Sequence, residues 1–436
     1  MTPAAKKRIT RALILFFVLS LIPLVSWLGW NPAAATISEW KKALDLWSGI
    51  LLGGAMLALV ASALRLPAVE KFMGGMPESY RFHRFLGIAT AGLLAFHWWM
   101  PRKIVETVVA LGFAEAPVRK AREAAEGFDF IGWLGHDVAW LGWLMFALIA
   151  VALFGKFIRQ TRWVQIHRLF APVALIGAAH GIAGVPDGFL MGLGWWATVA
   201  IALLTVAVVV LEFRMTNLRV SGKVLAEEMV TDADKSLTLS AALHRPVEPG
   251  EFVCLSLDKS EHPHPFTVAS VDAPAADGTQ TFTVIVRALG EYSTKIVREP
   301  VAGRTVVLEG PYGEFLRNPD ATKPQVWVAG GIGVTPFLAM MKAAKALPGT
   351  RLVWSTRGSE TKLAEMVRRA ALESDVELTI IDSAKGQRLG KTHHLAQYTA
   401  GGAEVHCCGP EGLVKAAAEG LGKLGIRPLV EHFAWR

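Results

Sequence analysis

Six long apolar runs without charged residues dominate the first half of the chain and constrain its fold more than any other feature. A hydrocarbon core about 30 Å thick needs roughly 20 apolar residues of helix to cross it, and backbone groups in lipid must be hydrogen-bonded within the segment. The runs occupy residues 12–30, 46–64, 85–100, 138–155, 169–185 and 189–211. We therefore expect residues 1–214 to form a six-helix transmembrane bundle.

Lysine and arginine residues predict the orientation of this bundle. They cluster before the first run, between the second and third, between the fourth and fifth, and after the sixth. By the positive-inside rule, the N-terminus and everything after residue 214 are then cytoplasmic. Residues 101–130 mix acidic with basic side chains and are expected to form a surface helix outside. The first run is longer than the roughly 7–15 residues of a signal-peptide core, so a cleaved signal peptide is the less favoured alternative.

Charge and cysteine content exclude several classes of protein. The net charge of +8 does not indicate nucleic-acid binding, because much of it falls in the inner loops, where topology and anionic lipid account for it. The three cysteines, Cys254, Cys407 and Cys408, form no CxxC pair and no cluster of four. Disulfides and iron–sulfur centres are therefore not expected.

Two pairs of histidines interrupt the apolar runs. His83 lies two residues before the third run and His97 lies within it, fourteen residues further on. His167 lies two residues before the fifth run and His180 lies within it, thirteen residues further on. Both runs cross in the same direction, so one histidine of each pair lies near the inner face. Four imidazoles at two levels suit two stacked b-type haems, since each six-coordinate iron takes two axial nitrogens. The predicted ligand sets are His83 with His167 for the inner haem, and His97 with His180 for the outer.

Other interpretations of these histidines are a hydrogen-bonded contact between helices or a proton path, which normally includes acidic partners in the spans. The six runs contain no acidic residue. Fourteen residues return close to the same helix face but thirteen do not, so we expect Pro172 to kink or unwind the fifth span. Arg84 and Arg168, beside the inner histidines, are candidates for pairing with haem propionates.

Residues 215–320 alternate short strands with turn signals, which predicts a small antiparallel β-barrel. The segment HPHPFTVAS, residues 262–270, contains Phe266, Thr267 and Ser270. Phe266 supplies an aromatic face, and Thr267 and Ser270 supply polar atoms, a combination that suits a planar redox ring. GEYSTKI, which begins at Gly290, offers amides and hydroxyls at a helix start that suit a pyrophosphate. Ordinary strand–turn–strand structure is the alternative for each word alone.

Residues 321–436 alternate strands and helices and predict an open α/β nucleotide-binding domain. In QVWVAGGIGVTPFLAMMKAA a strand leads through Gly330, Gly331 and Gly333 into a helix, where backbone amides and the helix dipole favour phosphate. Arg357 follows the second strand, where an arginine favours a 2′-phosphate and hence NADPH over NADH. Arg388 is a second candidate for that contact.

Together these segments resemble the ferric reductase / NADPH oxidase superfamily, most closely its compact bacterial NADPH oxidase-like members. The resemblance covers nearly the whole chain and includes the histidine spacing, HPFTVAS, GPYGEF, GGIGVTPF and CCGPEG in the family's order. It implies a six-helix transmembrane di-haem domain over 1–214, a ferredoxin-reductase-type FAD barrel over 215–320 and an NADPH-binding α/β domain over 321–436. The resemblance also implies a multi-pass protein of the bacterial inner (plasma) membrane.

The resemblance also implies roles for individual residues. HPFT stands in place of the family's Arg-x-Tyr-Ser/Thr flavin motif, so Phe266 would cover the isoalloxazine and Thr267 would hydrogen-bond near its reactive nitrogen. The implied FAD contacts further include His264, Pro265, Ser270, Arg287, Gly290, Ser293 and Thr294. The implied NADPH contacts are Gly331, Gly333, Thr335 and Arg357 at the phosphates, with Cys408, Gly409 and Pro410 beside the nicotinamide. Phe433, or alternatively Trp435, would be the terminal aromatic that shields the flavin; Thr267, Cys408 and Phe433 are the implied catalytic residues.

The predicted function is electron transfer from cytoplasmic NADPH, or alternatively NADH, through FAD and two haems to an extracytoplasmic acceptor. Oxygen, giving superoxide, is the favoured acceptor. The alternatives are a ferric chelate, a periplasmic protein partner docking on residues 101–130, or a non-redox proton or metal transporter. The histidine and arginine that some animal oxidases place beside the outer haem have no clear counterpart here. No EF-hand word indicates a calcium switch.

Overall fold

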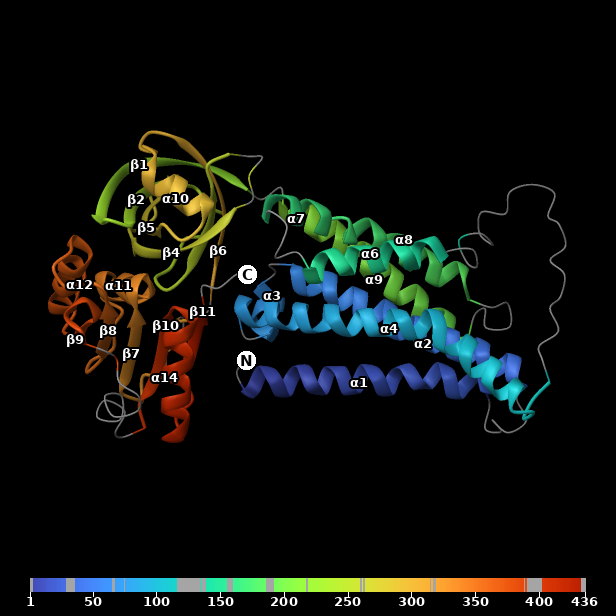
Figure 1. Cartoon of the computed structure of the whole chain (residues 1–436). Helices are drawn as coiled ribbons and strands as arrows, with labels where there is room; N and C mark the ends of the chain where they lie inside the picture. The colour runs from blue at the N-terminus through green and yellow to red at the C-terminus, as the bar shows by residue number, and fades with distance from the viewer. Residues whose placement is uncertain are drawn as a thin grey trace. The chain divides into compact units, whose positions relative to one another are not determined.

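The structure is a computed structural model that describes residues 3–28, 36–64, 67–73, 75–115, 134, 139–154, 160–185, 192–216, 219–258, 261, 263–313, 315–316, 319–387, 389 and 402–432. The chain divides into two compact units, Met1–Thr216 and Asn217–Arg436, which Figure 1 shows from blue to red along the chain. The first unit is helical, and the second contains all the strands that the structure describes.

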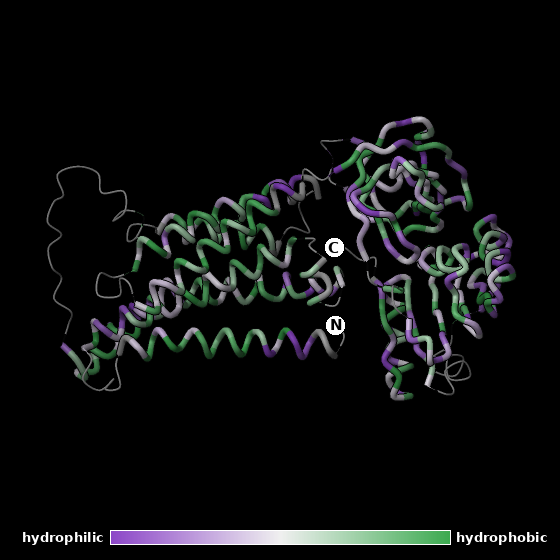
Figure 2. The backbone as a smooth tube through the Cα atoms, turned by 180° about the vertical axis from the view of Figure 1, so that it is seen from behind, coloured by the Kyte–Doolittle hydropathy of each residue, from purple (hydrophilic) through white to green (hydrophobic). Residues whose placement is uncertain are grey.

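Long helices run side by side in the first unit (Figure 1). Its helices are α1 (Pro3–Leu28), α2 (Ile37–Ala63), α3 (Pro67–Met73), α4 (Met76–Ala110), α6 (Ala139–Phe154), α7 (Gln160–His167), α8 (Phe170–Ala183) and α9 (Leu193–Thr216). Figure 2 shows hydrophobic colour along most of their length. Among the described residues, four helical stretches are long and apolar enough to cross a membrane: Lys6–Ser26, Ile37–Ala63, Gln165–Ala183 and Leu193–Leu211.

The third and fourth predicted spans are also helical, but these helices fit a membrane span less well in length or hydropathy. Helix α4 is long, and His97, Trp98 and Trp99 interrupt its apolar stretch. Helix α6 is strongly apolar but has only 16 residues. The expected separate surface helix over 101–130 is wrong at its start, because α4 continues without a break through Pro101 to Ala110; residues 116–130 lie outside the described residues.

The fifth predicted span is broken beside its inner histidine. Helix α7 ends at His167 and α8 begins at Phe170. Pro172 has no N–H to bond the Arg168 carbonyl, and that carbonyl instead accepts from Ala171 N at 3.2 Å. The break that the sequence predicts near Pro172 is therefore confirmed, and it lies between the two histidines of this span.

The second unit contains a closed antiparallel barrel, as the sequence predicts. Its strands are β1 (Val220–Thr231), β2 (Asp234–Ala241), β3 (Phe252–Ser256), β4 (His264–Val271), β5 (Gln280–Arg287) and β6 (Thr305–Tyr312), with helix α10 (Glu291–Arg298) after β5. The order β1-β2-β5-β4-β3-β6 closes because β1 pairs with both β2 and β6. Alternate residues fill the interior, among them Leu237, Leu239, Phe282 and Val284, each at most 1% exposed.

A five-stranded parallel sheet forms the rest of the second unit. Its strands are β7 (Gln325–Gly330), β8 (Arg351–Thr356), β9 (Glu377–Asp382), β10 (Glu404–Gly409) and β11 (Leu429–His432), in the order β11-β10-β7-β8-β9. Helices α11 (Thr335–Lys342) and α12 (Lys362–Glu373) cover one face, and α14 (Glu411–Lys423) covers the other (Figure 1). Short 3₁₀ turns, η4 (Gly331–Val334) and η5 (Ser383–Lys385), follow β7 and β9.

The barrel and the sheet share a hydrophobic core. Val230, Ala269 and Ile285 from the barrel belong to the same buried cluster as Phe337 and Met340 of α11. Such continuous packing holds two elements in a fixed arrangement. Motif residues from the two predicted cytoplasmic domains therefore lie in one compact unit.

Candidate functional site

The four histidines of the first unit meet as the two predicted pairs. The ring centroids of His83 and His167 are 5.9 Å apart, and those of His97 and His180 are 6.4 Å apart. Each pair joins α4 to a helix of the broken fifth span. The members of each pair come from different helices, and fourteen residues of α4 separate the two levels by roughly 21 Å along the helix axis.

Both separations fit a metal held between two imidazoles. A metal about 2 Å from each ring nitrogen, as in zinc–imidazole bonds, separates the two nitrogens by about 4 Å. The added distance from each nitrogen to its ring centre brings the centroids to roughly 6 Å apart, as observed. The arrangement supplies two nitrogens per level, which is the axial set of a six-coordinate b-type haem.

The second ring nitrogen of three histidines is held by a hydrogen bond. His97 Nδ1 lies 2.9 Å from Ser48 Oγ, and His180 Nδ1 lies 2.9 Å from the Leu134 carbonyl. His83 Nδ1 lies 3.1 Å from Ser62 Oγ and 3.0 Å from the Leu59 carbonyl. Partners of this kind place the proton on Nδ1 and leave Nε2 free as a ligand. The residues present therefore fit a haem at each level.

Two further features concern the surroundings of these pairs. Gly49 of α2 lies against the His97 ring, since a Cβ at Gly49 would be in van der Waals contact, 3.4 Å from His97 Cε1. Arg84 and Arg168, predicted to pair with haem propionates, are both exposed beside the inner pair. Their pairing with propionates remains a prediction.

The flavin motif HPFT lies on β4, and it meets the GEYST motif through an aromatic stack. The His264 ring lies 4.0 Å from the Tyr292 ring at an angle of 12°. Tyr292 in turn accepts a hydrogen bond from Leu257 N at 2.9 Å, and burial raises the pKa of its hydroxyl. Sequence reasoning missed Tyr292, although it is the one aromatic residue of GEYSTKI.

The remaining predicted flavin residues have contacts within the barrel. Phe266 is half-buried and packs against the barrel core, Thr267 is 8% exposed, and Pro265 and Ser270 are half-buried. Ser293 Oγ accepts from the amides of Leu289 and Gly290, each at 3.0 Å. This hydroxyl therefore caps the start of α10. The amide of Thr294 bonds the Gly290 carbonyl at 2.9 Å.

Arg287 forms a forked ion pair instead of standing alone. Its Nε and Nη2 lie 2.6 and 2.7 Å from the two carboxylate oxygens of Asp234, which is fully buried. A Cβ at Gly331 would lie 2.6 Å from Arg287 Nη1, so the guanidinium lies against the glycine turn after β7. The structure thus places Arg287 between barrel and sheet. Its predicted contact with the FAD pyrophosphate remains a prediction.

The strand order places a topological switch point between β7 and β10. Strands β8 and β9 follow in order on one side of β7, and strands β10 and β11 follow in order on its other side. In open α/β sheets, ligands bind beyond the carboxyl ends of the strands at such a reversal. Here these ends carry Gly331 after β7 and Gly409 at the end of β10, and both motifs were predicted to contact NADPH.

Close backbone packing explains two glycines at this edge. A Cβ at Gly333 would lie 2.7 Å from Gly409 Cα and closer still to the Cys408 carbonyl. Gly409, at φ +156°, lies against Gly330 in the same way. Gly331 has a φ of +52°, which favours glycine. The glycines were predicted to admit phosphate; Gly333 also lets the turn contact β10 directly.

Other predicted nucleotide residues have defined environments. Thr335 Oγ1 donates to the Ile332 carbonyl at 3.1 Å, which closes the turn before α11. Cys408 is fully buried, and burial, followed by the nearby Glu431 and Cys407, raises the pKa of its thiol. Burial therefore favours the protonated thiol over the thiolate. Pro410 follows β10 at the first position before α14.

Arg357 is exposed at the carboxyl end of β8, and a residue missed in the sequence orders its loop. The Asp382 carboxylate, at the end of β9, accepts from the amides of Gly358 at 2.9 Å and Ser359 at 2.7 Å. These hydrogen bonds, with that of Gly358 the largest, hold the pKa of Asp382 well below its usual range. Asp382 is therefore the residue that positions the Arg357 loop.

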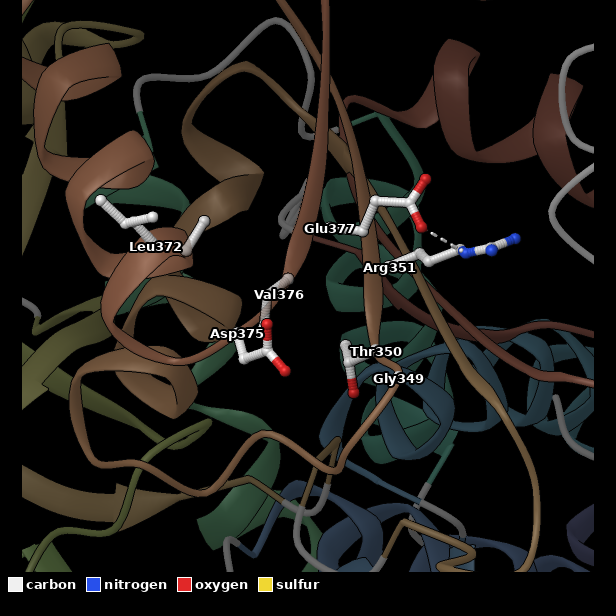
Figure 3. Close-up of a pocket in the computed structure, with 8 residues that line it drawn as sticks. Gly349, Thr350, Arg351, Leu372, Asp375, Val376 and Glu377 are labelled. Carbon is white, nitrogen blue, oxygen red and sulfur yellow. Dashed lines mark ion pairs between the residues drawn. The ribbon is translucent and has the colours of Figure 1, made fainter.

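A surface pocket in this unit lies away from the switch point between β7 and β10. Figure 3 shows Arg351 and Glu377 beside it, with Arg351 Nε 2.8 Å from Glu377 Oε2. These residues begin β8 and β9, so the pocket lies at the amino ends of the strands. Nucleotides bind at the opposite ends, and we do not assign this pocket to a cofactor.

Two predicted groups fall outside the described residues. They are Arg388 and the terminal aromatics Phe433 and Trp435. The last described residue, His432, pairs in register with Gly409. Strand β11 thus ends at the same edge of the sheet as β10 and its Gly409, and Phe433 is the next residue in the sequence.

Comparisons with known proteins find a dual oxidase and a ferric reductase among other relatives. The chain is 36% identical over 121 residues to dual oxidase 2 of Rattus norvegicus, covering 24% of this chain and 8% of that protein. It is 30% identical over 188 residues to the probable cell surface ferric reductase kap2 of Aspergillus oryzae, covering 38% of this chain and 25% of that protein. The chain thus spans a quarter or less of the length of these relatives. No known protein-family profile matches it.

A solved structure similar to the chain is the flavohemoglobin of Malassezia yamatoensis with bound FAD and heme. It has a TM-score of 0.47 and 16% sequence identity, and the alignment covers 90% of this chain and 98% of that one. The matches to a dual oxidase and a ferric reductase agree with the motifs that the barrel and sheet carry. Over part of its length the chain is therefore similar to oxidoreductases of two kinds, a dual oxidase and a ferric reductase.

Proposed function

We propose that the chain transfers electrons from cytoplasmic NADPH, through FAD and two bis-histidine b-type haems in a six-helix bundle, to an acceptor on the extracytoplasmic side of a bacterial inner membrane. The observation that carries the proposal is the meeting of two histidine pairs at two levels, 5.9 and 6.4 Å between ring centroids. When bound, the flavin converts a hydride into single electrons, which haem iron accepts one at a time.

The first unit would hold the two haems, and the second unit would bind FAD and NADPH. His83 with His167 and His97 with His180 would hold one haem each. Because each pair would fill both axial positions, neither iron would have a site for a ligand, which suits electron transfer rather than catalysis at the metal.

In the second unit, β4 and the start of α10 would hold FAD. Thr267 would hydrogen-bond the ring edge and Phe266 would cover its face. The His264–Tyr292 stack fixes the distance between these two motif segments, and Ser293 keeps the α10 amides ordered. Gly331, Gly333 and Thr335 would shape the edge that receives the NADPH phosphates, with Cys408 to Pro410 beside the nicotinamide and Phe433 shielding the flavin.

Selectivity for NADPH is predicted to depend on Arg357. Replacing it with alanine removes a charged hydrogen bond worth about 1.5–3 kcal/mol, which corresponds to a KM for NADPH higher by roughly tenfold to a hundredfold. The KM for NADH should change little. Arg351→Ala, at the other end of β8, is the matched control. Equal effects of Arg357→Ala on both nucleotides would contradict the assignment.

Oxygen is the acceptor we favour, and superoxide the product; the ferric-reductase relative makes a ferric chelate the second candidate. The test follows the haem absorption bands of the purified, FAD-supplemented protein after NADPH is added under argon. We expect the bands to show reduction, and admitted air to reverse it rapidly. Bands that stay reduced in air, but reoxidise with ferric citrate, would replace oxygen by the chelate. An absence of haem bands, together with an absence of flavin bands before FAD is added, would overturn the proposal and favour a transporter.

A further inference from the structure

We propose that Ser48 and Ser62 of α2 hold the two α4 histidines and set the reduction potentials of the two haems separately. The inference rests on the proposed function, because it takes the histidines as haem ligands. It concerns residues outside every motif that the sequence singled out. Ser48 is fully buried and Ser62 is 8% exposed.

The two serines match the two histidines in spacing. Ser48 and Ser62 are fourteen residues apart on α2, as His83 and His97 are on α4. Helices α2 and α4 pack side by side (Figure 1). Ser48 Oγ lies 2.9 Å from His97 Nδ1, and Ser62 Oγ lies 3.1 Å from His83 Nδ1. The order is reversed between the helices, so an antiparallel neighbour supplies one hydroxyl to each level.

The direction of these hydrogen bonds follows from the other partners of each hydroxyl. A serine has one hydroxyl hydrogen. Ser48 Oγ donates to the Leu44 carbonyl at 2.6 Å, and Ser62 Oγ donates to the Leu59 carbonyl at 2.9 Å. With that hydrogen committed, each Oγ accepts a hydrogen bond from the histidine Nδ1–H. The tautomer is thereby fixed, and Nε2 carries the lone pair.

An acceptor on Nδ1–H changes the ligand as well as its orientation. It raises the basicity of the imidazole, and a stronger donor stabilises the oxidised iron over the reduced. Second-shell hydrogen bonding of this kind is one of the ways in which a protein tunes haem. Loss of the serine acceptor should therefore raise the reduction potential of the haem at that level.

The two levels differ in how much they depend on serine. His83 Nδ1 has a second acceptor, the Leu59 carbonyl at 3.0 Å. Among the described residues, Ser48 is the partner found for His97 Nδ1. We therefore expect Ser48→Ala to have the larger effect, and Ser62→Ala a smaller one because Leu59 can take the whole hydrogen bond.

The test is a potentiometric titration of full-length protein in detergent, followed by the haem absorption bands. Ser48→Ala should shift one of two one-electron steps to higher potential, with a change in the reduced-to-oxidised ratio on the order of tenfold, which is 59 mV. Ser20→Ala is the matched control: its buried hydroxyl accepts from Trp47 Nε1 at 3.1 Å, and both steps should stay unchanged.

Single-haem backgrounds assign each step to a level. In a His97→Leu background, which would keep only the inner haem, Ser62→Ala should shift the remaining step and Ser48→Ala should not. Two haems per chain with potentials unaltered by both serine variants would overturn the inference while leaving the proposed function intact. Absence of haem from the wild-type protein would instead overturn the proposed function. Shifts equal to that of Ser20→Ala would also overturn the inference.

Discussion

Replacing His97 with leucine is expected to leave one haem per chain instead of two and to abolish reduction of the extracytoplasmic acceptor. Leucine fills a similar volume but offers no nitrogen, so His180 would lose the partner now 6.4 Å from its ring centroid. The inner pair, His83 with His167, does not involve His97. NADPH-dependent reduction of a soluble dye by the flavin should continue, because the substitution leaves the second unit, Asn217–Arg436, unchanged. The measurement is haem content per chain together with both activities.

Phe85→Leu provides a matched control for this experiment. Phe85 lies on the same helix, is 62% exposed and belongs to neither histidine pair. We expect this variant to retain two haems and the wild-type rate of acceptor reduction. Retention of two haems and full activity by His97→Leu would show that the outer pair is not a ligand set.

Replacing Gly333 with alanine is expected to be the most damaging small change in the second unit. The added Cβ would lie 2.6 Å from the Cys408 carbonyl carbon and 2.7 Å from Gly409 Cα, and neither residue can move freely because both belong to the buried strand β10. Overpacking of this kind costs about 1–3 kcal/mol. The η4 turn must shift away from the end of β10, so NADPH-dependent dye reduction should fall tenfold or more.

The matched control is Gly412→Ala, four residues beyond Cys408. A Cβ at Gly412 meets nothing within 4 Å, and alanine favours the α14 helix that contains it. We expect near-normal dye reduction and unchanged or higher thermal stability. Haem content should be normal in both variants, which separates local damage from failure to fold. A Gly333→Ala protein as active as Gly412→Ala would rule out close packing as the reason for glycine there.

Much of the candidate site could be predicted because it depends on local patterns. Apolar run length predicted the helices, although α4 and α6 carry weaker spanning character than their runs suggested. The histidine spacing predicted both pairs. The structure also has the expected break between His167 and Phe170, two residues before Pro172.

The contacts that hold the site could not be predicted, because they join segments far apart in the sequence. Asp382 orders the Arg357 loop only because β9 lies beside β8. The sequence does not show that Arg287 forms an ion pair with Asp234, because Asp234 becomes its neighbour only when β2 pairs with β5. Tyr292 becomes notable only through its stack on His264.

The sequence by itself determined the class of protein: apolar runs long enough for lipid, histidines within them, and glycine turns after strands are local features that need no partner to be recognised. Only the tertiary structure decided which distant residues contact these histidines and glycine turns. Serine is an ordinary residue inside a helix, and nothing in α2 marks Ser48 or Ser62 until α4 packs against it. Their proposed role depends on a distance of about 3 Å between a serine Oγ on one helix and a histidine Nδ1 on the other. Side-chain packing between the helices sets this distance, and the hydrophobic periodicity of the sequence does not reveal it.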